Sequence, residues 1–173
     1  MIDDAADAIT MLQGTVQEEI LTRTSILDDA RCRDIVAYNK TQPKPLIPMV
    51  IIVDEFADLA DQLSLNRKAK TEFYTAIRKV AQAGRSRGIH LVLCTQRPSA
   101  QLVPTDIRSL MNCRIAFRVN KREDSQMILD ESGAENLQMP GDLLYKDDRG
   151  GVRRALGYFT DVSLLEKTVK KCS

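Results

Sequence analysis

Net charge, histidine and long apolar runs are all scarce in this sequence, and each shortage excludes a class of protein. Twenty-five basic and 24 acidic residues leave a formal net charge of +1. The chain therefore lacks the overall basic excess that usually marks a nucleic-acid-binding protein. Any such surface must be local and made by a few Arg and Lys side chains in loops. The longest aliphatic run, residues 49–53, is far too short to cross a bilayer.

The four cysteines and the single histidine do not predict a metal or redox site. Cys32, Cys94, Cys113 and Cys172 form no C-x-x-C pair, so we expect reduced thiols in a cytosolic protein. His90 lies within an apolar run without companion ligands, and we expect it to be packed and hydrogen-bonded rather than metal-bound. The opening Met-Ile-Asp-Asp is no signal peptide. We expect a cytoplasmic domain. The sequence does not decide whether an inner-membrane anchor lies further upstream.

Alternating strand and helix patterns predict an α/β fold with a mostly parallel sheet flanked by helices. Strand patterns occupy residues 49–53, 89–95 and 113–119, and the first two read as strands buried on both faces. Helical patterns occupy residues 3–23, 27–38, 66–83 and 123–130 and the last dozen residues, and residues 141–159 read as a β-hairpin. We expect a single partial domain, with residues 1–48 as a helical lead-in and residues 49–173 as its core.

The strongest local signal is Ile51-Ile-Val-Asp-Glu55, an apolar strand that ends in two carboxylates, which is the Walker B pattern. Ligands of open α/β sheets bind at the carboxyl ends of the strands. Asp54 is predicted to hold Mg²⁺, directly or through water, because Mg²⁺ prefers carboxylate oxygens and keeps several waters. Glu55 is predicted to polarise the water that attacks the γ-phosphate of ATP. The alternative is that both carboxylates only cap the next helix, whose first turn favours anions.

The blocks around this motif resemble the FtsK/SpoIIIE family of DNA-translocating ATPases, in order and at near-family spacing. The matching blocks are residues 33–39, Val53-Asp-Glu-Phe-Ala-Asp-Leu59, Arg85-Ser-Arg-Gly-Ile-His-Leu-Val-Leu-Cys-Thr-Gln-Arg-Pro-Ser99, Arg114-Ile-Ala-Phe117, residues 124–130, residues 133–135 and residues 139–145. The resemblance covers nearly the whole chain. It implies a RecA-like P-loop NTPase fold, ATP and Mg²⁺ as cofactors, and a homo-oligomeric ring, expected to be a hexamer. Such a ring moves double-stranded DNA in chromosome or plasmid segregation and cell division.

The resemblance also implies roles for two residues near the second strand. Gln96 matches the residue that senses the γ-phosphate or the attacking water, although a polar residue beginning a loop is the alternative. Arg85 matches the arginine finger that is donated into a neighbouring subunit's site, and Arg87 is close enough to compete for that role. For both arginines the alternative is a basic helix end that the helix dipole favours.

Three basic residues match the loops that line the family's central channel and contact DNA phosphates: Arg97, Lys121 and Arg122. For Lys121 and Arg122 the alternative is a solvated helix start. Two departures weaken the match. Gln126 replaces an Arg of the family's second loop, and the segment between residues 58 and 85 is a few residues longer.

A phosphate-binding Walker A loop, G-x-x-x-x-G-K-[ST], is missing, since the sequence contains no Gly-Lys pair. Because everything downstream of that loop resembles the family, we expect truncation at the N-terminus and a fragment that is inactive alone. Two alternatives remain. A conjugative coupling or type VII secretion ATPase shares the core but moves another substrate, and a non-catalytic module only binds nucleic acid or assembles.

Overall fold

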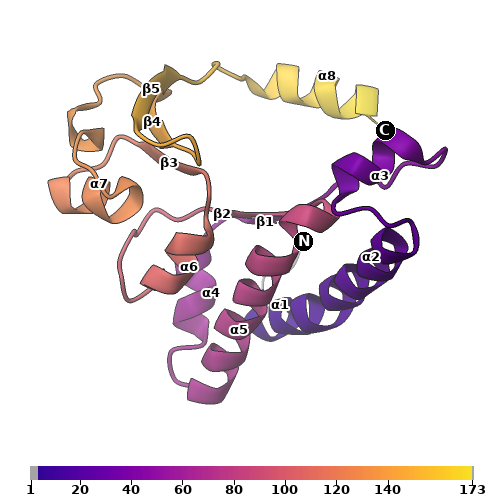
Figure 1. Ribbon diagram of the computed structural model, residues 1–173. Helices are drawn as coiled ribbons and strands as arrows, with labels where there is room; N and C mark the ends of the chain where they lie inside the picture. The colour runs from indigo at the N-terminus through magenta and orange to yellow at the C-terminus, as the bar shows by residue number, and fades with distance from the viewer. Residues whose placement is uncertain (1–3, 173) are drawn as a thin grey trace. The chain divides into compact units, whose positions relative to one another are not determined.

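A computed structural model describes residues 4–172, without the side chains of residues 167, 171 and 172. The chain divides into two compact units, Met1–Met111 and Asn112–Ser173, and each is described by itself (Figure 1). Among the described residues no helix is long and apolar enough to cross a membrane.

The first unit begins with helices α1, Ala5–Met11, and α2, Gln17–Asp29, joined by a π-helical turn, η1, Leu12–Val16. Asp4 caps α1 by accepting hydrogen bonds from the Ala6 and Asp7 amides; Asp3, also expected as a cap, lies outside the described residues. The helical run extends to Asp29, so the expected end at residue 23 was wrong. The next helix, α3, Ile35–Thr41, starts later than expected because Asp34 caps it.

The centre of the first unit is a pair of parallel strands, β1, Met49–Val53, and β2, Ile89–Leu93, paired in register from Met49↔Ile89 to Val53↔Leu93. Helices α4, Phe56–Gln62, and α5, Arg67–Ala83, and a 3₁₀ turn, η2, Arg85–Arg87, connect the strands. Helix α6, Thr105–Leu110, follows β2. Since both strands run the same way, the segments after Val53 and Leu93 leave the same edge of the sheet.

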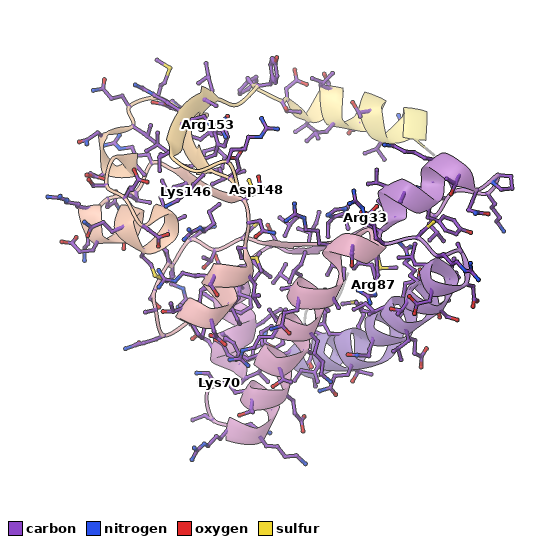
Figure 2. All side chains as sticks on the ribbon, in the orientation of Figure 1. Arg33, Lys70, Arg87, Lys146, Asp148 and Arg153 are labelled. Atoms are coloured by element: carbon purple, nitrogen blue, oxygen red, sulfur yellow. The ribbon has the colours of Figure 1, made fainter. Side chains whose placement is uncertain are left out.

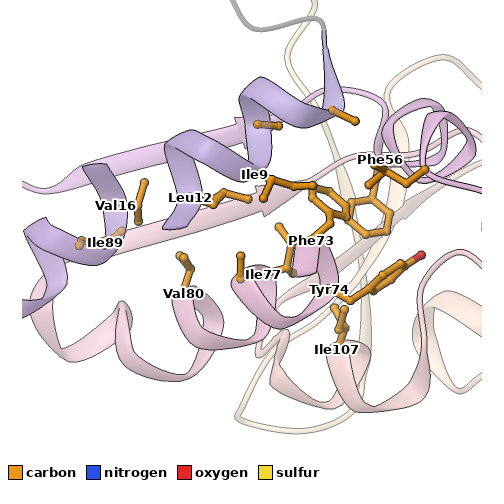
Figure 3. Close-up of a cluster of buried hydrophobic side chains, with 14 of the residues drawn as sticks. Ile9, Leu12, Val16, Phe56, Phe73, Tyr74, Ile77, Val80, Ile89 and Ile107 are labelled. Carbon is orange, nitrogen blue, oxygen red and sulfur yellow. The ribbon is translucent and has the colours of Figure 1, made fainter. Parts of the chain in front are cut away.

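One apolar core holds these elements together (Figure 3). Ile9, Leu12 and Val16 of α1 and η1 face Ile77 and Val80 of α5, and all five are buried. Three aromatic rings continue the same core towards α4. The Phe56 and Phe73 centroids are 5.5 Å apart, and the ring of Tyr74 is edge-on to both. Phe56, the first residue of α4, therefore anchors the chain directly after the Walker B carboxylates.

Within the described residues of the first unit only one face of the β1–β2 pair is covered, so this unit does not by itself provide the expected burial on both faces. Met49, Ile51 and Val53 pack on the core, whereas the alternate residues Val50 and Ile52 are 57% and 66% exposed. His90 is also exposed, on this open face, and was wrongly expected to be packed. A continuous apolar run indicates that both faces are apolar; it does not specify what covers each.

The second unit is an antiparallel sheet in the order β3-β4-β5, with strands β3, Arg114–Phe117, β4, Asp142–Lys146, and β5, Val152–Leu156. It also holds α7, Arg122–Leu129, the 3₁₀ turn η3, Ala134–Asn136, and α8, Val162–Cys172. The expected hairpin is β4–β5, turned by Gly150 and Gly151, which both have positive φ. The expected third strand, β3, pairs antiparallel with β4 of this hairpin. Antiparallel sheets commonly bury one face and expose the other, which agrees with the alternating burial of β3.

Candidate active site at the carboxyl edge of β1 and β2

The segments that follow β1 and β2 are joined by a continued backbone ladder. The Cys94 amide donates to the Val53 carbonyl and the Phe56 amide donates to the Cys94 carbonyl, both at 2.8 Å. This ladder brings Asp54 and Glu55 beside residues 94–97. Asp54 and Glu55, at the end of one predicted strand, and Gln96, after the next, therefore lie at the same edge of the sheet.

Glu55 is the most constrained side chain at this edge. Its Oε1 accepts from the Thr95 hydroxyl at 2.6 Å and from the Ala57 amide at 3.1 Å, and its Oε2 accepts from the Gln96 amide at 2.8 Å. Glu55 therefore does cap α4, as the alternative interpretation held. Two of its three hydrogen bonds, however, come from the loop after β2 and not from α4.

These contacts favour the charged form of Glu55. Partial burial opposes ionisation, but the hydrogen bonds from Thr95, Gln96 and Ala57, with the nearby Arg97 charge, hold the pKa of Glu55 below its ordinary value. At neutral pH the carboxylate is therefore ionised, in the state required to orient a water molecule.

Asp54 differs from its neighbour because it is exposed. No group in the part of the chain that the structure describes donates a hydrogen bond to its carboxylate. Across the described residues there is also no cluster of three or more His, Cys, Asp or Glu side chains. Mg²⁺ fits such a sparse donor set, since it is commonly bound by one or two carboxylates together with waters and substrate phosphates.

Arg97 follows Gln96 and is held by carboxylates of α4. Its Nη2 lies 3.0 Å from Asp58 Oδ1 and 2.9 Å from Asp61 Oδ2. The hydrogen bond and charge of Asp61, with the further charges of Asp58 and Glu55, raise the pKa of Arg97 above its ordinary value. The side chain is still 53% exposed. The sequence did not predict this pairing.

The arginines of the Arg85-Ser-Arg87 segment lie at the opposite edge. Both precede β2, whereas Glu55 follows β1, so within one chain a strand length of about 17 Å separates them from the carboxylates. Arg87 is bound inside its own chain: it donates to the Thr24 hydroxyl on α2, and to the Ala83 carbonyl at 3.0 Å (Figure 2). Arg85 is exposed.

A buried arginine, which the sequence analysis did not single out, binds backbone carbonyls at the amino edge of the strand pair. Arg23 of α2 donates to the carbonyls of Arg87 and Ile47, both at 2.9 Å, and pairs with Glu19 at 2.6 Å. The turn beside it needs Gly88, whose φ is +69° and whose Cβ, if present, would lie 2.3 Å from Ile35 Cδ1. A single arginine among the other charged residues of this helix gave no signal of this role.

Lys121 and Arg122 belong to the second unit. Arg122 is the first residue of α7 and Lys121 directly precedes it, and both are exposed. The pKa of Glu135 is lowered by the Gly133 amide hydrogen bond and, to a smaller extent, by the charge of Arg122, so Arg122 lies in a local cluster that includes an anion. Gln126, which departs from the family pattern, is also exposed. The DNA-binding role of these residues stays a prediction.

Comparison with known proteins identifies relatives over nearly the whole chain. The sequence model of the FtsK/SpoIIIE family matches residues 1–100. A DNA translocase FtsK of Treponema pallidum is 43% identical over 135 residues, which cover 73% of this chain and 16% of that protein. A DNA translocase FtsK of Bradyrhizobium diazoefficiens is 34% identical over 169 residues, which cover 98% of this chain and 20% of that protein. The chain thus spans about a fifth or less of the length of these relatives.

Solved structures establish the fold. The conjugation coupling protein TcpA of pCW3, with ATPγS, superposes with a TM-score of 0.84 at 22% identity, covering 99% of this chain and 50% of that one. The type VII secretion ATPase EccC of Thermomonospora curvata gives a TM-score of 0.73 at 22% identity, covering 96% of this chain and 20% of that one. The expected fold class, a RecA-like P-loop NTPase core with a C-terminal hairpin, is confirmed. With the family's sequence model matching its first 100 residues, the chain belongs to the FtsK/SpoIIIE family.

Proposed function

We propose that this chain is part of a ring-forming motor that couples ATP hydrolysis to movement along double-stranded DNA. The observation that carries the proposal is the Glu55 carboxylate, held ionised at the carboxyl edge of two parallel strands by Thr95 and Gln96. Ligands of open α/β sheets bind at this edge. All 173 residues belong, in this proposal, to one motor domain on the cytoplasmic side of the membrane.

Each residue at the carboxyl edge has a distinct task. Asp54 holds Mg²⁺ directly or through water, and a bound Mg²⁺ neutralises charge that develops on the phosphates. Glu55 accepts a hydrogen bond from the attacking water and orients it. Three donors occupy three of about four acceptor positions on its carboxylate, and one is left for that water. The exposed amide side chain of Gln96 contacts the γ-phosphate or the water.

Two further sets of residues act outside this edge. Arg85, which is exposed and matches the family's finger position, supplies the finger to the site of a neighbouring subunit. Arg97, Lys121 and Arg122 contact DNA phosphates. The phosphate-binding loop is proposed to lie in the remaining length of the protein, because this chain has no Gly-Lys pair and spans 20% or less of its relatives.

The decisive experiment changes Glu55 in the full-length protein. Glu55→Gln keeps the shape of the side chain and removes its charge, so DNA-stimulated ATP hydrolysis is expected to fall by about 10²–10⁴-fold while nucleotide binding persists. Glu72→Gln on α5, where Glu72 only approaches Lys68 at 4.0 Å, is the matched control and is expected to keep full activity. ATPase activity of Glu55→Gln within a factor of a few would reject Glu55 as the catalytic carboxylate.

The 173-residue chain alone gives a second test. Without a phosphate-binding loop it is expected neither to bind ATP tightly nor to hydrolyse it, because Asp54 by itself is a weak Mg²⁺ ligand. Micromolar ATP affinity in a calorimetric titration would contradict the proposal that the loop lies elsewhere.

A second candidate function keeps the ATPase and changes the transported substrate. Its support is the pairing of Arg97 with Asp58 and Asp61, which offsets the positive charge of the first loop, and the loss of a cation at Gln126. A coupling or secretion ATPase is then the proposed class. The measurement that separates the two is stimulation of the ATPase by duplex DNA.

A further inference from the structure

Thr95 connects the catalytic candidate Glu55 to the loop that carries Arg97. The Thr95 hydroxyl donates to Glu55 Oε1 at 2.6 Å and accepts a hydrogen bond from the Arg97 amide at 3.1 Å. A hydroxyl has a single hydrogen and two lone pairs. Because the Arg97 amide occupies a lone pair, it orients the hydroxyl so that its hydrogen points at the carboxylate.

The hydroxyl is the only side-chain donor on this carboxylate within the described residues. The other donors are the backbone amides of Ala57 and Gln96, at 3.1 and 2.8 Å. The Ala57 amide lies within α4 and the Gln96 amide within the loop after β2. Thr95 shares Oε1 with Ala57, so loss of the hydroxyl leaves that oxygen with one longer bond and an additional open acceptor position.

We infer that Thr95 is a positioning residue for ATP hydrolysis: its hydroxyl fixes the orientation of the Glu55 carboxylate and so selects the acceptor position that remains for the attacking water. The inference rests on the proposed function, in which Glu55 orients that water. Thr95 does not contact the substrate and acts through Glu55. The amide that orients the hydroxyl belongs to Arg97, whose side chain is a candidate DNA-binding group.

The size of the effect follows from geometry. A reacting group displaced by about 1 Å can cost about a hundredfold in rate. ATP binding is expected to be kept, because the Thr95 hydroxyl contacts the Glu55 carboxylate and the Arg97 amide, neither of which is proposed to hold the nucleotide. The expected signature is therefore a fall in kcat at an unchanged KM.

The experiment compares Thr95→Val, Thr95→Ala and Thr95→Ser in the full-length protein. Valine keeps the shape without the hydroxyl, alanine removes the whole group, and serine keeps the hydroxyl alone. Valine and alanine are expected to lower kcat by about 10- to 100-fold with KM within about twofold, and serine to stay within about threefold of wild type. Thr10→Val on α1, where the hydroxyl donates to the Ala6 carbonyl at 2.9 Å, is the matched control and is expected to keep wild-type kcat.

Glu55→Gln and the double variant Glu55→Gln/Thr95→Val separate this inference from the proposed function. If Thr95 acts through Glu55, the double variant is no slower than Glu55→Gln alone. An active Glu55→Gln protein overturns the catalytic role of Glu55 and, with it, this inference. An inactive Glu55→Gln protein beside wild-type kcat in both Thr95→Val and Thr95→Ala overturns the inference about Thr95 alone. A loss in Thr95→Ser as large as in Thr95→Val assigns the effect to the methyl group and also overturns it.

Discussion

The two ends of the β1–β2 strand pair are built for different purposes. At the carboxyl end, Asp54 is exposed and Glu55 is held by hydroxyl and amide donors that leave room for a further ligand. At the amino end, Arg23 is 6% exposed and its guanidinium is used by Glu19 and by backbone carbonyls. Both ends contain charged groups. At the amino end the charge of Arg23 is satisfied by groups of the same chain. At the carboxyl end the carboxylates keep acceptor positions open for a ligand, as a catalytic site requires.

After Glu55, the largest expected effect comes from Arg85, the amino-end residue proposed to act in another subunit's site. Arg85→Ala subunits of the full-length protein are expected to lose ATPase activity by about 10³-fold, the scale of an arginine finger. Mixing them with Glu55→Gln subunits is expected to restore part of the activity, since a Glu55→Gln neighbour still donates its finger.

The control for the mixing experiment is ring assembly, measured by size-exclusion chromatography with light scattering. Intact rings without any recovery of activity point to Arg87, or to a structural role for Arg85. Recovery fixes the finger at Arg85 and makes the amino end of one chain part of its neighbour's active site.

Arg23 tests the structural role of the amino end. Arg23→Met leaves the Arg87 and Ile47 carbonyls and the Glu19 carboxylate without their buried donor, and is expected to lower the free energy of unfolding by about 2–4 kcal/mol. Arg33→Met is the matched control, because Arg33 also pairs with an acid, Asp34, but its side chain is 90% exposed (Figure 2). Thermal unfolding followed by circular dichroism measures both. Equal melting temperatures for the two variants would contradict the assignment.

Arg97 tests the carboxyl end for DNA binding. Arg97→Ala in the full-length protein is expected to weaken binding equally on two duplexes of unrelated sequence, and to reduce the slope of log K against log salt by about 0.9 for each phosphate that the arginine neutralises. Lys44→Ala, an exposed cation before β1, is the control and leaves the slope unchanged. An unchanged slope with normal DNA stimulation for both Arg97→Ala and Arg122→Ala favours the candidate function with another substrate.

The smallest expected effect is on the pH dependence of hydrolysis. Because the pKa of Glu55 is lowered, the carboxylate stays charged down to a pH below the ordinary range of glutamate, and protonation removes the base only below that. The acid limb of kcat in the full-length protein is expected to fall below pH 4.5, the ordinary glutamate value. Initial rates measured at constant ionic strength, on protein shown to be folded at each pH, test this. An acid limb above pH 5 contradicts a stabilised Glu55 carboxylate.

Much of this arrangement could be predicted from the sequence because local patterns determine it. The run 49–53 followed by two carboxylates predicted a strand end with a polar edge, and Asn66 caps a helix that spans the expected residues. Thr95 and Arg23 were not predicted. Their roles depend on contacts across 40 and 64 positions of the chain, and neither a threonine at a strand end nor an arginine on a helix differs locally from a solvent-exposed one. The predicted burial of both faces of β1 also depended on distant contacts. The apolar run indicates that both faces are apolar, but it does not indicate which segment covers each face.

The open face of β1 and β2 has a practical consequence for handling this polypeptide. Val50, Ile52 and Val92 present aliphatic surface to water, and across the described residues β1 and β2 pair only with each other. Each strand thus has a row of backbone amides and carbonyls able to accept another strand, beside an apolar surface that favours association. Expressed as 173 residues, the polypeptide is therefore expected to self-associate as its concentration rises, which light scattering measures. Polar substitutions at positions 50 and 52 are expected to reduce that association, because they remove aliphatic surface from the open face.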